Sequence, residues 1–139
     1  MGLFSGTRPD NLGVRDGRLA PAKPTPNNVS SQAEKGDAQH FIESLRYSGD
    51  PRQAWTALRR VIDGMPRVKV LKSDPNYLYA EFSSRLMGYV DDVEFYLDEA
   101  AGAIQVRSAS RLGRSDFGVN RERIESIRAK LAQASSKGA

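Results

Sequence analysis

The chain has 139 residues, a formal net charge of +4 and no cysteine. The length suits one domain, since domains commonly run to about 100–150 residues. The lack of cysteine excludes disulfides, thiolate metal sites and thiol catalysis. With 39% hydrophobic and 27% charged residues, the composition is that of a globular protein and excludes a wholly disordered chain.

The first residues, Met1 to Gly6, lack the long apolar run of a secretory signal, and glycine at position 6 breaks the myristoylation pattern. No window approaches the roughly 18 apolar residues that a membrane helix needs. We therefore predict a soluble, cytoplasmic protein without a membrane span.

Residues 1–36 are rich in glycine, proline, asparagine and serine, and they show no sustained periodicity. Three prolines between Ala20 and Asn28 favour an extended or turning path. We interpret 1–36 as an extended N-terminal segment, 37–133 as the folded domain and 134–139 as a flexible tail.

Residues 40–47 mix apolar and polar positions, which predicts either a short strand or an irregular lead-in. A helix start follows, because Asp50 can cap the chain, Pro51 suits the first helical position and Gln53 can complete a capping box. The helix is expected to end at Gly64 and Pro66. Its apolar stripe consists of Trp55, Leu58, Ile62 and Met65.

Four strands are predicted next, near residues 68–70, 77–82, 92–97 and 104–108, from apolar and polar residues that alternate. No helix lies between them, so they should form an antiparallel meander. A last helix is expected to begin at the cap Asn120 and to bury Ile124, Ile127 and Leu131. The predicted fold class is α+β: a two-layer sandwich with a four-stranded antiparallel sheet, one helix before it and one after it.

The polar face of this sheet is the first candidate site. Placing Phe95 opposite Val106 puts Glu94 opposite Arg107, with Asp92 and Glu81 close by. One interpretation is a cross-strand ion pair on a solvated face. The other is a carboxylate–guanidinium site in a pocket, where Asp92 and Glu94 would be the candidate acid and base.

The second candidate is the loop that joins the last strand to the last helix. A helix start offers free N–H groups to an anion, and arginines add bidentate donors. The alternative is a structural lock, in which Asp116 and Asn120 cap the loop and the arginines bind carbonyl groups. The predicted ligand-binding residues are Arg107, Ser108, Ser110, Arg111, Arg114, Asp116, Asn120 and Arg121, with Asp92 and Glu94 in support.

No catalytic residue, metal site or cofactor is predicted. His40 is the single histidine, and no histidine or cysteine cluster accompanies it. The aromatic residues of the strands are divided between the two faces, which argues against a stacking platform for nucleic acid.

Several motifs in fixed order carry a family resemblance that spans roughly Arg8 to Leu131. They are Arg8-Pro9-Asp10-Asn11-Leu12-Gly13-Val14, Asp16-Gly17-Arg18-Leu19, Pro26-Asn27, Val29-Ser30-Ser31-Gln32, Gly49-Asp50-Pro51 with Ala54-Trp55, Tyr89-Val90-Asp91-Asp92-Val93-Glu94-Phe95 and Arg107-Ser108-Ala109-Ser110-Arg111, followed by Gly113, Asp116, Gly118, Asn120-Arg121, Arg123 and Glu125. In these motifs the chain resembles the bacterial domain-of-unknown-function family numbered 1499.

The resemblance implies that the N-terminal segment belongs to the module and packs on the domain. The chain departs from the family pattern at Asn28, where the family typically has cysteine, so it cannot share a thiol-dependent activity. Our leading hypothesis is a non-enzymatic module that binds an anionic ligand or acidic partner at the arginine- and serine-rich loop. The alternatives are a small hydrolase-like enzyme and a protein-interaction scaffold.

Overall fold

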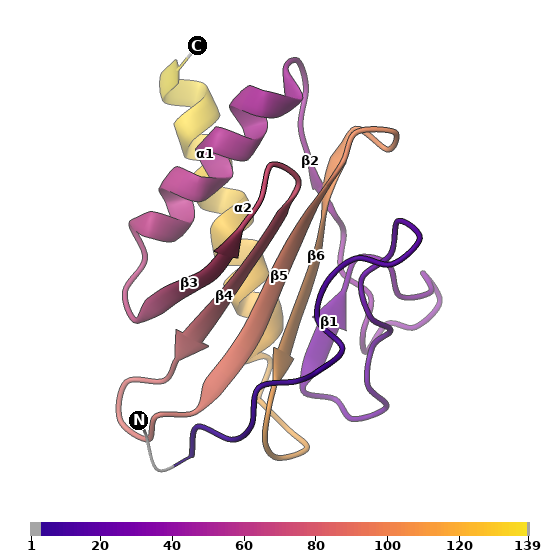
Figure 1. The fold of residues 1–139 in the computed structure, drawn as a ribbon, viewed down its shortest axis with the longest axis vertical. Coiled ribbons are helices and arrows are strands. Elements are labelled where there is room, and N and C mark those ends of the chain that lie inside the picture. The colour runs from indigo at the N-terminus through magenta and orange to yellow at the C-terminus, as the bar shows by residue number, and fades with distance from the viewer. Residues whose placement is uncertain (1–3, 139) are drawn as a thin grey trace.

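A computed structural model describes residues 4–138, so Met1 to Leu3 and Ala139, the last residue of the expected tail, lie outside the described part. The observed class is α+β, with two helices and one sheet (Figure 1). The elements are β1 (Asn28–Ser30), β2 (Leu45–Arg46), α1 (Pro51–Asp63), β3 (Val68–Ser73), β4 (Tyr77–Ser83), β5 (Val90–Asp98), β6 (Ala103–Ser110) and α2 (Val119–Gly138).

The sheet has six antiparallel strands in the described residues, and the prediction of four was wrong. The strand order is β1-β6-β5-β4-β3, and β2 also pairs with β6. The four-strand count left out β1 and β2, which have only three and two residues, too few for a period-two pattern to be visible. β2 lies within residues 40–47, where a short strand was one of the two predicted alternatives. The four predicted strands are present, and the predicted register of Glu94 opposite Arg107 is confirmed.

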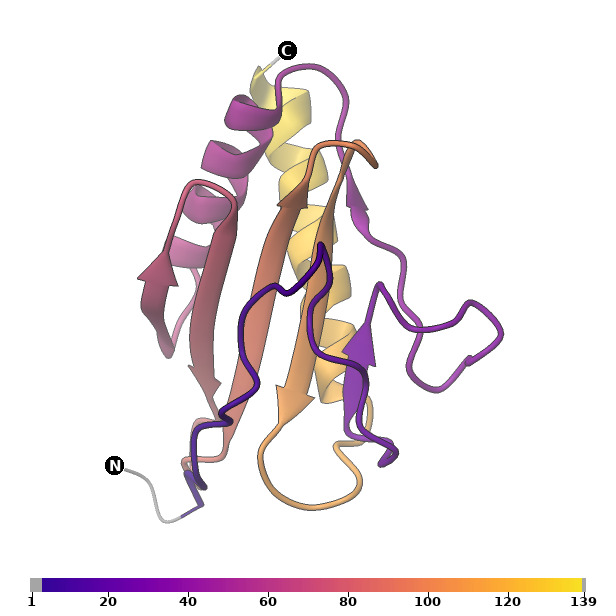
Figure 2. The same cartoon turned by 45° about the vertical axis from the view of Figure 1, so that its right-hand side comes forward.

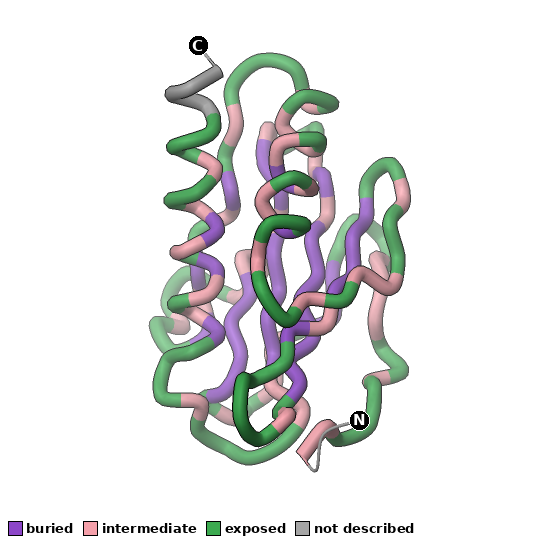
Figure 3. Tube along the Cα trace, turned by 90° about the vertical axis from the view of Figure 1, so that its left-hand side faces the viewer, coloured by how far each residue is buried: buried purple, intermediate pink, exposed green. Residues whose placement is uncertain are grey.

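Both helices cover one face of the sheet, where the main core lies (Figures 1 and 2). Leu58 and Ile62 of α1 and Ile124 and Ile127 of α2 are fully buried against the strands. Asp50 caps α1, and its side chain accepts from the Arg52 N–H at 2.9 Å. In Figure 3 the central strands are mostly buried, whereas the loops and the outer helix turns are exposed.

The opposite face of the sheet lies beneath residues 8–22, a segment that we call the strap (Figure 2). Leu19 of the strap forms a second apolar cluster with Tyr77 and Tyr79, against which Leu12 and Val14 pack. The main chain of the strap is bound as well, since the Gly13 N–H donates to the Glu94 carboxylate at 2.8 Å. The sheet is therefore covered on both faces.

Asn28, at the position where the resemblance leads one to expect cysteine, anchors the proline-rich turn that follows the strap. Its buried side chain accepts from the Lys23 N–H at 2.9 Å and donates to the carbonyls of Lys23 and Thr25. The Asn28 side chain therefore holds the turn of residues 23–28 in place, and we call this set of hydrogen bonds the turn lock.

Two loops lie at the same end of the sheet, the β4–β5 loop (84–89) and the β6–α2 loop (111–118) (Figures 1 and 2). The prediction of Asn120 as the helix cap was wrong, because α2 begins at Val119. The capping group is Asp116, whose carboxylate accepts from the N–H groups of Gly118 and Asn120 at 2.9 and 3.0 Å. From residue 4 to residue 138, no helix has the length and apolarity needed to cross a bilayer.

Candidate functional site

The charged residues of the sheet face under the strap are buried and bound to one another. The Arg107 Nη1 lies 3.9 Å from the Glu94 Oε1, and both side chains are almost fully buried. The other Glu94 oxygen accepts from the Tyr77 hydroxyl at 2.6 Å and from Gly13. The Glu94 Oε1 and the Arg107 Nε have no hydrogen-bond partner among the described residues. Burial raises the pKa of the Glu94 carboxyl above its usual value.

Arg111 is the centre of the second charged group on this face. It binds Asp92 in a bidentate manner, with both N–H···O distances at 2.9 Å, and donates to Glu81 at 2.6 Å. Arg8 of the strap also binds Glu81, at 2.7 Å. Burial acts to raise the pKa of Glu81, but the hydrogen bonds from Arg8 and Arg111 hold that pKa below its usual value. These arginines are therefore occupied by carboxylates of the same chain.

The predicted serines lie on the other face of the sheet, under the helices. The Ser108 hydroxyl donates to the Asn120 side-chain oxygen at 2.6 Å, and the Asn120 amide donates to the Ser110 hydroxyl at 2.8 Å. Arg123 of α2 joins this network through Ser108 and forms an ion pair with Asp91 at 2.7 Å. Successive residues of a strand point to opposite faces, so Ser108 and Ser110 cannot share a site with Arg107 and Arg111.

Two further predicted arginines lie in different surroundings. Arg121 donates to three main-chain carbonyls, those of Ala38, Gln39 and Phe41, and so ties α2 to the segment before β2. Arg114 is exposed on the β6–α2 loop, beside the capping residue Asp116. The structure thus divides the predicted set among four places: the strap-covered face, the helix-covered face, the loop end and, for Arg121, the contact between α2 and residues 38–41.

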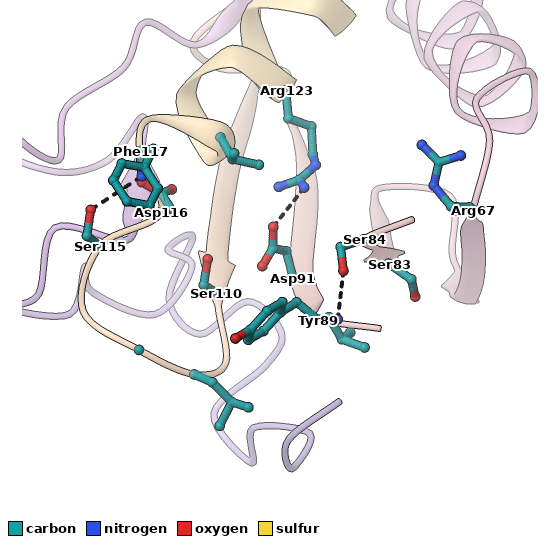
Figure 4. Close-up of a pocket in the computed structure, with 14 residues that line it drawn as sticks. Arg67, Ser83, Ser84, Tyr89, Asp91, Ser110, Ser115, Asp116, Phe117 and Arg123 are labelled. Carbon is teal, nitrogen blue, oxygen red and sulfur yellow. Dashed lines mark hydrogen bonds and ion pairs between the residues drawn. The ribbon is translucent and has the colours of Figure 1, made fainter. Parts of the chain in front are cut away.

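The loop end contains a pocket of about 480 Å³ between the β4–β5 loop and the β6–α2 loop. In Figure 4, Arg67 lies on one side and Ser115, Asp116 and Phe117 lie on the other, with the Arg123–Asp91 ion pair between them. The lining residues are Arg67, Ser83, Ser84, Tyr89, Val90, Asp91, Ser110, Leu112, Gly113, Ser115, Asp116, Phe117, Val119 and Arg123. Of the predicted ligand-binding set, only Ser110 and Asp116 line it.

Two side chains that line this pocket stand on strained backbone. Arg67 and Phe117 have φ angles of 56° and 54°, in the left-handed region that favours glycine. A bulky residue held there costs roughly 1–2 kcal/mol, and such positions cluster at ligand clamps and active sites. Phe117 is also 92% exposed, so its ring gains nothing from packing in the core.

The charged groups at the pocket differ in whether they have partners within the chain. The Asp91 carboxylate forms an ion pair with Arg123. Partial burial acts to raise the pKa of Asp116, but hydrogen bonds from Asn120 and Gly118 keep that pKa below its usual value. Arg67 is exposed and forms no ion pair within residues 4–138. Arg67 and Phe117 were not among the predicted site residues. For Phe117, the sequence signal was an aromatic residue between Asp116 and Gly118 in a polar loop.

The described residues contain no group of three or more histidine, aspartate or glutamate side chains placed to hold a metal ion. The arrangement at the loop end offers guanidinium and hydroxyl donors beside apolar walls. It is suited to holding an anion that carries an apolar part.

Comparison with known proteins gives one match. The family model described as "Protein of unknown function (DUF1499)" matches residues 18–131, which is most of the chain and includes the sheet, α1, the larger part of α2 and the pocket. No curated protein and no solved structure matches.

Proposed function

We propose that this chain, which belongs to the DUF1499 family, is a binding module whose loop-end pocket takes a small organic anion with an apolar part. The hypothesis of an anionic ligand at the strand-to-helix loop is kept. The residues proposed to bind it are different, because Arg107, Arg111 and Arg121 already bind groups of the same chain. The protein's location in the cell stays a prediction.

The proposal depends chiefly on the position of Arg67. It is exposed, it lines a pocket of about 480 Å³, and no carboxylate in residues 4–138 pairs with it. Its φ of 56° is unfavourable for a residue with a side chain, and strained positions of this kind cluster at ligand clamps and active sites. An arginine of this kind is free to form charge-assisted hydrogen bonds with a carboxylate or phosphate.

The remaining walls define the ligand class. Hydroxyl groups of Ser83, Ser84 and Ser115 line the pocket near the charged groups, and Leu112 and Phe117 give it apolar sides. Pockets for small molecules commonly have volumes of about 300–1,000 Å³, with a few polar groups among apolar ones. A short alkyl phosphate or a medium-chain carboxylate matches this combination.

The hydrolase-like alternative requires Asp92 and Glu94 to reach a substrate. Both are at most 1% exposed, and both already accept hydrogen bonds from tyrosine hydroxyls. The strap lies over them, so no acid–base pair is accessible on that face in this conformation. The geometry therefore favours binding at the loop end.

Thermal shift assays and calorimetry with hexyl phosphate, hexanoate, inorganic phosphate and hexanol test the proposal. Hexyl phosphate or hexanoate should stabilise the protein more than inorganic phosphate, which has no apolar part, and more than hexanol, which has no negative charge. Arg67→Gln should weaken binding about tenfold or more, because a hydrogen bond to a charged group is lost.

The matched control is Arg60→Gln, which removes an arginine that is also exposed, on α1. This variant should bind as tightly as the wild type. The proposal fails if no probe stabilises the protein, or if Arg67→Gln binds hexyl phosphate with unchanged affinity.

A further inference from the structure

The large apolar side chains that are exposed in the described part of the chain all lie at one end of the molecule. Four of them, Leu86, Met87, Leu112 and Phe117, are on the β4–β5 and β6–α2 loops, and Tyr89 and Val119 end these loops. Leu86 and Phe117 are 89% and 92% exposed, so they stand almost entirely in solvent. Scattered exposed apolar residues are ordinary, but their collection on two adjacent loops marks an interaction surface.

The same loops carry unpaired positive charge. Arg85 on the β4–β5 loop and Arg114 on the β6–α2 loop are exposed, and neither forms an ion pair within residues 4–138. The acids at this end, Asp91 and Asp116, are engaged by Arg123 and by main-chain N–H groups. Further along the chain, the next exposed acid is Glu122, in the first turn of α2.

We propose that this end of the molecule docks on the surface of an anionic lipid bilayer. Leu86, Met87 and Phe117 enter the headgroup–acyl boundary, and Arg85 and Arg114 contact the lipid headgroups. Apolar side chains surrounded by cations are the pattern by which proteins bind an anionic interface without spanning it.

The shape of the surface favours a bilayer over a protein partner. The two loops stand on either side of the pocket of about 480 Å³, so the apolar side chains are divided between two tips. A stable protein–protein interface needs a complementary surface of about 1,000 Å² or more. A bilayer accepts separate protruding side chains. The docking surface shares Leu112 and Phe117 with the pocket wall, whereas Arg85, Leu86 and Met87 do not line the pocket.

Co-sedimentation with vesicles tests the proposal on the full chain. The wild type should bind vesicles of phosphatidylcholine mixed with phosphatidylglycerol and bind pure phosphatidylcholine weakly, and salt should reduce the binding. The pair Leu86→Ser with Phe117→Ser should lower the partition coefficient about tenfold or more. The pair Arg85→Gln with Arg114→Gln should lower it about fivefold per arginine.

The matched control pair, Arg52→Gln with Arg60→Gln on α1, removes the same net charge from exposed positions away from the loops. It should leave binding close to the wild-type value. A direct readout comes from Phe117→Trp in a Trp55→Phe background, whose single tryptophan should be quenched by brominated lipids.

Three results would overturn the proposal. The first is no binding of the wild type to anionic vesicles, and the second is an equal loss of vesicle binding in the loop arginine pair and the α1 arginine pair. The third is a wild-type dimer that is abolished by the double substitution of Leu86→Ser with Phe117→Ser. The last result would assign the surface to a second copy of the chain. A failure on vesicles while hexyl phosphate still stabilises the protein would refute docking and leave the pocket proposal intact.

Discussion

The strap-covered face and the loop end both contain several arginines, and they use them in opposite ways. Under the strap, Arg107 and Arg111 are buried and lie against Glu94, Asp92 and Glu81. At the loop end, Arg67, Arg85 and Arg114 are exposed and form no ion pair in the described chain. The difference teaches that arginine density along a sequence does not locate a binding site. Burial and internal partners decide which arginines are free.

The largest predicted effect concerns Arg111, which holds Asp92 and Glu81 together. Replacing it by leucine leaves a buried carboxylate without its cation, so we expect the free energy of unfolding to fall by about 3–5 kcal/mol. Urea denaturation measures this change. Arg114→Leu, on the same loop but exposed, should change stability by no more than about 0.5 kcal/mol. Similar losses in the two variants would remove the distinction between the two regions.

A smaller loss is expected at the turn lock. Asn28→Cys restores the residue that the family resemblance leads one to expect, and it removes the hydrogen bonds to Lys23 and Thr25. The unfolding free energy should fall by about 1–3 kcal/mol, because buried main-chain groups lose their partners. The exposed Asn11→Cys serves as the control, with an expected change within about 0.5 kcal/mol. A stable Asn28→Cys protein would show that the turn holds without the amide.

The strands β3 to β6 could be predicted from the alternation of apolar and polar residues, and placing Phe95 opposite Val106 predicted the β5–β6 register, with Glu94 opposite Arg107. The strap could not be placed from composition, since its cover of the sheet depends on isolated residues such as Leu12 and Leu19 that meet distant tyrosines. β1 was not predicted, and β2 was predicted only as one alternative for residues 40–47, because both strands depend on pairing with β6 and have no pattern of their own.

Part of the candidate site could be predicted as well. The β6–α2 loop was predicted to bind a ligand, and Asp116 of this loop lines the pocket together with Ser110 of β6. Ligand binding by these residues stays a prediction. Arg67 could not be predicted as a site residue, because it precedes β3 and reaches the pocket only through the pairing of β3 with β4. At the end of that pairing the Ser83 N–H donates to the Arg67 carbonyl at 3.0 Å. The alternation along β6 places Arg107 and Ser108 on opposite faces of the sheet, so the sequence itself contains the pattern that divides the predicted set.

The pH dependence of stability distinguishes the buried pair from an ordinary salt bridge. A carboxyl whose folded-state pKa lies above its usual value of 4.5 binds its proton more tightly in the folded chain. The stability it contributes is therefore present below pH 4.5 and is lost as the pH rises through the folded-state pKa. The unfolding free energy of the wild type minus that of Glu94→Gln should decrease from acidic to neutral pH in urea titrations. An increase would mean that Arg107 stabilises the carboxylate more than burial penalises it.

The smallest predicted effect is at Phe117. Phe117→Gly relieves the positive φ and loses no core contact, so stability should stay the same or rise by up to about 1 kcal/mol. Leu86→Gly, equally exposed but without a positive φ, should lose a few tenths of a kcal/mol through chain entropy. Thermal unfolding compares the two. A clear loss for Phe117→Gly would mean that the ring stabilises the fold.

The most direct test of the contrast between the two regions is a titration of the isotope-labelled protein with hexyl phosphate, followed by amide chemical shifts. We predict that the perturbed amides lie at Arg67 and in residues 83–91 and 110–119, and that the strap and the buried residues Glu94 and Arg107 keep their shifts. Perturbations centred on residues 8–22 and on the strap-covered strands would contradict the account, because they would place the ligand on the face that we assign to structure.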